Sequence, residues 1–167
     1  MTPAQLLTDA FERILEAGTA AVDGLDADQL AHRPGADANP IGWLVWHAAR
    51  VQDDHVAGVA DLEQVWTAQG FARRFDLPYD DASIGYGQSS EEVGALRAEA
   101  DLLVEYLRAV HAQTTAYVAT LGAEDLDRVV DEHWDPPVTL AVRLVSVVND
   151  DLQHVGQAAY VRGLLGA

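Results

Sequence analysis

Two short segments of the chain carry residue types that could hold a divalent metal ion. The first is Trp-Leu-Val-Trp-His at 43–47, and the second is Asp-Asp-Leu-Gln-His at 150–154. A carboxylate and an imidazole four residues apart, as in Asp150 and His154, lie on the same face of a helix. One imidazole from a facing helix, His47, would complete a site with three protein ligands. Such a site leaves a coordination position open for a reactant.

Helical projection places these residues on faces that are otherwise apolar. At about 100° per residue, the neighbours within about 60° of His47 are Trp43, Leu44, Val51, Asp54 and Gly58, whereas Gln52 and Asp53 point away. Asp150 and His154 share a stripe with Leu140, Val147, Ala158, Val161 and Leu165. Burying imidazoles and a carboxylate without partners is costly, and this cost is the physical reason to expect a metal.

The same residues allow simpler interpretations. His47 could be a core histidine that bonds a backbone carbonyl or a water. Asp150 and His154 could form an exposed ion pair along one helix, which contributes only a few tenths of a kcal/mol. Asp151 is a rival ligand if the helical register differs by one residue.

Other polar residues are candidates for supporting roles. Asp54 could accept a hydrogen bond from a ligand residue, act as a fourth ligand or face solvent. Arg143 falls on the inward stripe and needs a carboxylate from the protein or from a bound molecule. His133 and Trp134 precede the last expected helix, where they could line the mouth of a pocket, or Trp134 could plug the end of the bundle.

Capping signals and hydrophobic spacing predict an all-α chain with four long helices. The first begins at Thr2-Pro3-Ala4-Gln5 and ends near residue 23, and the second begins at Asn39-Pro40 and runs to about residue 60. Ser89-Ser-Glu-Glu92 opens the third and longest, which continues to Leu121, and the fourth runs from the prolines at 136–137 to about Leu165. Residues 66–88 lack periodicity and predict a long crossing loop, with room for one helical turn. This pattern is typical of a four-helix bundle.

Composition limits the function classes. The 167 residues suffice for one hydrophobic core, so we expect a single domain over residues 1–167. A formal net charge of −17 argues against a nucleic-acid partner. Neither a membrane span nor a signal peptide is evident, which favours a cytoplasmic protein without a membrane partner. Because the chain has no cysteine, any metal must be held by His and Asp or Glu.

The fourth predicted helix is apolar over more than one stripe. Leu144, Val148, Leu152 and Val155 cover the arc beside the stripe of His154. A four-helix bundle buries only one stripe of each helix, so the second stripe needs either the crossing loop or another subunit. We therefore expect a homodimer.

Three stretches of the chain closely resemble the DinB-like superfamily, and in particular its actinobacterial mycothiol-transferase branch, also described as a domain of unknown function (DUF664-type). They are residues 21–34, 39–55 and 134–157, and the resemblance covers effectively the whole chain. It implies a DinB-like four-helix bundle with an up-down-down-up arrangement, often dimeric.

The resemblance also implies a divalent metal, usually zinc or nickel. Its ligands would be one His of the second helix and two residues four apart on the fourth, which here are His47, Asp150 and His154. Much of the superfamily has His at the position of Asp150, so this residue is a departure. A related isomerase has Glu there, but Asp is one methylene shorter, so the metal does not follow from the resemblance.

The activity that the resemblance implies is thiol S-transfer, in which mycothiol or a similar low-molecular-weight thiol attacks a small electrophile. A cation would favour the thiolate over the thiol, whose free pKa is about 8.5. In this interpretation Asp54 and Arg143 support the chemistry, and the substrate contacts are Trp43, His133, Trp134 and Gln157. Two other functions fit the same residues: a metal-dependent hydrolase that activates water, and a non-catalytic bundle that binds a metal or ligand.

Overall fold

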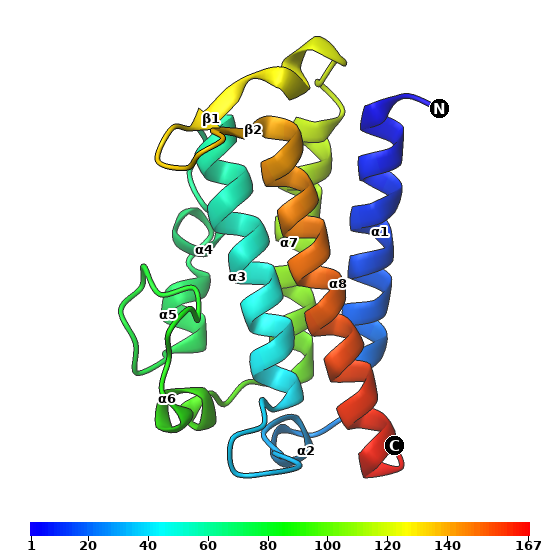
Figure 1. Ribbon diagram of the computed structural model, residues 1–167. Coiled ribbons are helices and arrows are strands. Elements are labelled where there is room, and N and C mark those ends of the chain that lie inside the picture. Colours follow the sequence, from blue (N-terminus) through cyan, green and yellow to red (C-terminus); the bar gives the residue numbers. More distant parts are fainter.

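Four long helices form the body of the protein. The computed structural model describes residues 1–167, and the long helices are α1 (Pro3–Val22), α3 (Ile41–Ala60), α7 (Ala100–Val118) and α8 (Leu140–Leu165). In Figure 1, α1 and α8 run downward and α3 and α7 run upward. α8 packs against α1 and α3, and α7 packs against the same two helices. The predicted all-α, up-down-down-up bundle is confirmed.

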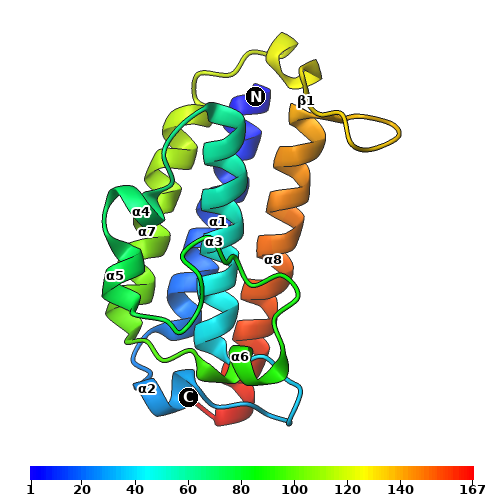
Figure 2. The same cartoon turned by 90° about the vertical axis from the view of Figure 1, so that its left-hand side faces the viewer.

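The connection between α3 and α7 runs back along the bundle. It covers residues 61–99 and contains α4 (Val65–Ala68), α5 (Phe71–Phe75) and α6 (Ser90–Ala95). Because α3 ends at the opposite end of the bundle from the start of α7, this segment travels the length of α3 (Figures 1 and 2). Two short helices form where one turn at most was expected, because Trp66, Phe71 and Phe75 are buried in the main core.

The third helix, predicted as one continuous element from residue 89 to 121, is interrupted. The capping box at Ser89 and Glu92 is present, but it opens only the short α6, and Leu96 has an extended ψ of 127°. Leu96 and Ala98 are buried whereas Arg97 and Glu99 are exposed. This alternation requires extended backbone, because neighbouring side chains then point to opposite sides. α8, with 26 residues, is the longest helix instead.

A small hairpin precedes α8. Strands β1 (Val129–Asp131) and β2 (Val138–Thr139) pair in antiparallel fashion after the 3-10 helix η1 (Glu124–Asp127). α8 therefore begins later than predicted, at Leu140, where the Thr139 side chain accepts a hydrogen bond from the Val142 amide. The hairpin loop projects from the end of the bundle (Figure 2). None of the helices has the length and apolar character needed to span a membrane.

The projection that placed Gln52 and Asp53 on the outward face of α3 is wrong. Both side chains are only 1% exposed, because α4 and α7 cover the face that the projection left free. Gln52 donates a hydrogen bond of 2.8 Å to the Thr114 hydroxyl of α7. Sequence periodicity describes one helix at a time, so it does not show how many neighbours a helix has.

Asp53 is the centre of a buried polar network. Its carboxylate accepts hydrogen bonds of 2.8 Å from the amides of Val65 and Trp66 and from the Tyr106 hydroxyl. The Arg50 guanidinium, fully buried, lies 3.6 Å away. Burial raises the pKa of Asp53, and these hydrogen bonds and the Arg50 charge oppose the rise. The network fixes α4 and α7 to α3.

We expect Asp53→Ala to lower the free energy of unfolding by about 3–5 kcal/mol, because it leaves the buried Arg50 without a carboxylate and two amides without an acceptor. Urea unfolding monitored by circular dichroism measures the effect. Asp81→Ala, at an exposed position of the connection, is the control and should change stability by less than about 0.5 kcal/mol. Equal stabilities of the two variants would contradict the assignment.

Candidate metal centre

α3 and α8 bring the three predicted ligands together. His47 comes from α3, and Asp150 and His154 come from successive turns of α8. One potential ligand atom from each residue lies within 4.8 Å of the others. His47 is 2% exposed, whereas the side chains of Asp150 and His154 are 23% and 17% exposed. The group is therefore shielded from solvent at His47, on α3, and is accessible to solvent at Asp150 and His154, on α8.

The donor set fits a divalent metal. His47 Nε2 lies 3.9 Å from Asp150 Oδ2, and His154 Nδ1 lies 3.4 Å from the same oxygen. That carboxylate oxygen is buried and has no hydrogen-bond partner, which is costly unless a cation satisfies it. Two imidazoles and a carboxylate are ligands that suit zinc and nickel.

Backbone carbonyls orient both histidine rings. His47 Nδ1 contacts the Ile84 carbonyl oxygen, and His154 Nδ1 lies 2.8 Å from the Asp150 carbonyl oxygen. If each Nδ1 carries the proton, both Nε2 atoms remain free as ligands, which is the usual arrangement of metal-binding histidines. Burial lowers the pKa of His47, the Ile84 carbonyl opposes this, and His154 lowers it further. Asp150 also opposes the lowering, and the net effect favours the neutral imidazole, the form that binds a metal.

Residues 83–88 of the connection, which we call the strap, cover His47. Gly85 has a φ of +102°, and a Cβ added to it would lie 3.0 Å from Trp43 Cζ2 and collide with the His47 ring. Gln88 accepts a hydrogen bond of 2.8 Å from Trp43 Nε1, and the Ser83 carbonyl accepts one of 3.3 Å from Arg50. Only a residue without a side chain lets the backbone approach this closely.

Trp43, predicted to contact the substrate, lies behind His47. Its ring stacks on the imidazole with a centroid distance of 4.6 Å and an interplanar angle of 16°, and the residue is 5% exposed. Its indole N–H is already donated to Gln88. The geometry therefore makes Trp43 a support for His47 and leaves it little surface for a ligand.

Tyr86 of the strap stands at the open side of the group, and the sequence reasoning missed it. Its ring lies 5.4 Å from His47, edge to face, and the residue is 62% exposed. Partial burial, followed by the charges of Asp150 and Asp151, raises its pKa, so its hydroxyl stays protonated and can donate a hydrogen bond. The Gly-Tyr-Gly sequence at 85–87 was the available signal, because paired glycines indicate a tight backbone path.

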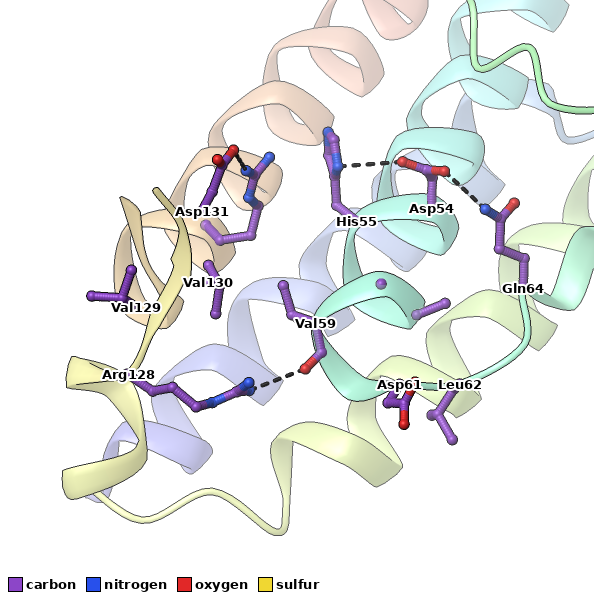
Figure 3. Close-up of a pocket in the computed structure, with 13 residues that line it drawn as sticks. Asp54, His55, Val59, Asp61, Leu62, Gln64, Arg128, Val129, Val130 and Asp131 are labelled. Atoms are coloured by element: carbon purple, nitrogen blue, oxygen red, sulfur yellow. Dashed lines mark hydrogen bonds and ion pairs between the residues drawn. The ribbon is translucent and has the colours of Figure 1, made fainter. Parts of the chain in front are cut away.

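Two cavities that share lining residues lie on this side of the bundle, and the smaller one opens beside Asp150. The smaller, of about 280 Å³, is lined by residues that include Asp150, Tyr86, His55 and Arg143. The larger, of about 730 Å³, shares His55 and Arg143 with it and extends toward Asp54 and Asp131. Figure 3 shows α3 on one side of the larger cavity and β1 on the other.

Asp54 and Arg143 line these cavities and are not part of the His47–Asp150–His154 group, which we call the metal group from here on. Asp54 accepts a hydrogen bond of 2.8 Å from Gln64, and its other oxygen lies 3.4 Å from His55 Nδ1 (Figure 3). It follows His47 by seven residues, about 10 Å along the helix, and so lies too far away to be a fourth ligand. Arg143 donates a hydrogen bond of 3.1 Å to Asp131.

The other predicted residues are more exposed. The His133 side chain is 96% exposed and Trp134 is 65% exposed, both in the loop between β1 and β2. His133 Nδ1 lies 2.9 Å from Asp131, and neither His133 nor Trp134 lines the two cavities. Gln157 is exposed on the turn of α8 that follows His154.

Asp151, the rival ligand, lies outside the group. It is fully buried on the core side of α8, and neither carboxylate oxygen has a hydrogen-bond partner. Burial, and then the neighbouring Asp150, raise its pKa well above the usual range. The helical register therefore selects Asp150 as the carboxylate that faces both histidines.

An all-α bundle with this topology is a DinB-like fold. A crystal structure of a conserved protein from Enterococcus faecalis is similar, with a TM-score of 0.93 and 31% identity over 100% of this chain and 99% of that chain. The sequence model of the mycothiol-S-transferase family matches residues 6–167, and the chain belongs to that family. None of the curated proteins matches the sequence.

We expect Gly85→Ala to weaken binding of Zn²⁺ or Ni²⁺ by about 10–100-fold, because the added methyl group pushes the Ile84 carbonyl away from His47. Competition with a chelating dye measures the affinity. Gly87→Ala is a matched control: Gly87 also has a positive φ, of 72°, but an added Cβ there meets no atom within 4 Å. If both variants lose affinity equally, backbone strain alone explains the effect and the strap does not position His47.

Proposed function

We propose that the protein is a metal-dependent S-transferase that joins mycothiol, or a similar low-molecular-weight thiol, to a small electrophile. The observation that carries this proposal is the His47–Asp150–His154 group at the edge of a polar cavity, in a chain of the mycothiol-S-transferase family. The chain has no cysteine, so the reacting sulfur has to come from a co-substrate. We place the reaction in the cytoplasm, where thiols are kept reduced.

The chain's own residues would hold and orient the reactants. His47, Asp150 and His154 would bind zinc or nickel, with the strap fixing the His47 ring. When bound, the metal supplies positive charge that lowers the thiol pKa from about 8.5 and favours the thiolate. Tyr86, at the same opening, can donate a hydrogen bond to the electrophile as negative charge develops on it.

The proposed reaction forms one bond from sulfur to carbon. The thiol proton passes to solvent, and the sulfur donates an electron pair to the electrophilic carbon. In a substitution the leaving group departs with its bonding pair, and in an addition the adjacent carbon takes up a proton. Arg143, with one nitrogen fixed on Asp131, can orient the electrophile in the small cavity. We assign contacts with protruding parts of the substrates to Gln157, His133 and Trp134.

We expect the native protein to bind one divalent metal per chain and to form a conjugate between mycothiol and an electrophile such as monobromobimane. His154→Ala should lose stoichiometric metal, measured by plasma mass spectrometry, because it removes one of three ligands. His47→Ala should lower conjugate formation by at least about 100-fold, measured by liquid chromatography, since the thiol is then no longer activated.

His32→Ala is the control for both measurements, because His32 is exposed and is not one of the residues that form the group. Unchanged metal content in His154→Ala would refute the ligand assignment. Metal binding without conjugate formation across a broad panel of electrophiles would leave a binding role in place of an enzymatic one.

We also propose that the protein forms a homodimer through α8. Leu144 and Val155, expected on the second apolar stripe, are buried within the bundle. Apolar side chains nevertheless remain exposed along the whole helix: Val142, Val145, Leu152, Tyr160 and Leu164. A row of this length on one helix is unusual for a surface that faces only water, and a symmetric partner would cover it.

Multi-angle light scattering at micromolar concentration is expected to give twice the chain mass of 18.0 kDa. Leu152→Glu should shift the mass to that of one chain, because it places a charge in the apolar row. Leu62→Glu, at an equally exposed leucine just after α3, is the control and should leave the mass unchanged. A native mass of one chain would refute the dimer.

A further inference from the structure

The larger cavity, which we call the end cavity, lies beside the smaller cavity that Asp150 lines, and the two share the lining residues His55 and Arg143. It has a volume of about 730 Å³ and is walled by the last turns of α3, the start of the connection, β1 and α8 (Figure 3). The residues that carry the metal group do not line it. It therefore has room for a part of a substrate that does not react.

The end cavity lies within reach of a molecule whose reactive atom is at the metal group. The two cavities share His55 and Arg143, and the smaller one is also lined by Asp150. His55 follows His47 by eight residues and Arg143 precedes Asp150 by seven, so on both helices the offset is about 10–12 Å. A thiol with its sulfur at the metal group and its polar body in the end cavity must carry that body at about this distance from the sulfur, which leaves space in the small cavity for the electrophile.

The lining of the end cavity suits hydroxyl groups and disfavours anions. Three carboxylates, those of Asp54, Asp61 and Asp131, line it, against the guanidinium groups of Arg128 and Arg143. Both arginines already have partners. Arg143 donates to Asp131, and Arg128 donates to the Val59 carbonyl at 3.0 Å and to the Tyr117 hydroxyl at 3.1 Å. A bound anion would therefore meet an excess of negative charge.

Hydroxyl groups are both donors and acceptors, so they can pair with the carboxylates and with the remaining guanidinium N–H groups. We propose that the end cavity binds the uncharged, polyhydroxylated part of the thiol co-substrate, and that it thereby selects a neutral polyol thiol over thiols with free carboxylates. This inference rests on the proposed thiol transfer. Mycothiol has this chemistry, because its acetylated cysteine is joined to a glucosamine–inositol unit without a carboxylate.

A substitution at Gly58 can test this proposal, because a larger side chain there would fill the end cavity and leave all of its polar groups in place. Gly58 of α3 lines the cavity, is exposed, and has no atom within 4 Å of an added Cβ. Gly58→Leu should therefore fold normally, since leucine is a better helix former than glycine, and its side chain would occupy the cavity. Gly58→Ala is the matched control, because it makes the same kind of backbone change and fills much less space.

The first readout needs no turnover. Isothermal titration with thiol-free N-acetylglucosamine–inositol, which is uncharged, should show binding to the native protein, a loss of at least tenfold in affinity for Gly58→Leu, and a change of less than twofold to threefold for Gly58→Ala. S-methylglutathione, a probe that carries two carboxylates, should bind at least tenfold more weakly than N-acetylglucosamine–inositol. Tighter binding of S-methylglutathione, or equal binding of N-acetylglucosamine–inositol by all three proteins, would overturn the inference.

The second readout separates this inference from the proposed function. The ratio of kcat/KM for mycothiol to kcat/KM for N-acetylcysteine amide, a neutral thiol that lacks the polyol, should fall at least tenfold in Gly58→Leu. If mycothiol is conjugated but this ratio does not change, the proposed function stands and the end cavity is not the polyol site. If N-acetylglucosamine–inositol binds as expected but no thiol is conjugated, the inference about the cavity stands and the transferase activity fails.

Discussion

The contact between the His47 ring and the Ile84 carbonyl is the interaction on which the site depends. It requires backbone from the connection to reach an imidazole in the middle of α3, and Gly85 permits that approach by having no side chain. The connection therefore has to run back along α3 rather than cross directly to α7 (Figure 1). The hydrogen bonds from Trp43 to Gln88 and from Arg50 to Ser83 hold the strap on either side of this contact. In consequence, the path of the connection determines the geometry of the site.

Buried polar groups serve two different purposes in this bundle. Around Asp53, the carboxylate has four partners, so the cost of burial is offset and the network contributes rigidity. Around Asp150, one carboxylate oxygen has no partner, so binding of a cation is favoured there. The two systems lie on different faces of α3, and the first holds in place the helices and the connection against which the second is built. A stable scaffold thus carries a site whose polar groups are incompletely satisfied until it is occupied.

The elements that depend on local chemistry could be predicted from the sequence. The capping boxes at Thr2 and Ser89, the spacing of Asp150 and His154, and the inward face of His47 all follow from neighbours within a few residues. The burial of Asp53, the extended backbone at Leu96 and the path of the strap could not be predicted. Each depends on contacts with segments that are distant in the sequence, and a helical projection contains no information about those contacts. Tyr86 was missed for the same reason, since only the strap brings it beside His47.

Asp150 contributes to the site in two ways, and this follows from helical geometry. Its carboxylate faces both imidazoles, and its backbone carbonyl, four residues before His154, accepts the hydrogen bond that orients that ring. The second contribution does not depend on the side chain, so a helix can carry His, Glu or Asp at this position and still orient the following histidine. The side chain is then free to adjust the charge and reach of the ligand set. With Asp, the net charge of the ligand set is one unit more negative than with a third histidine, and the same Asp also lines the small polar cavity beside the group.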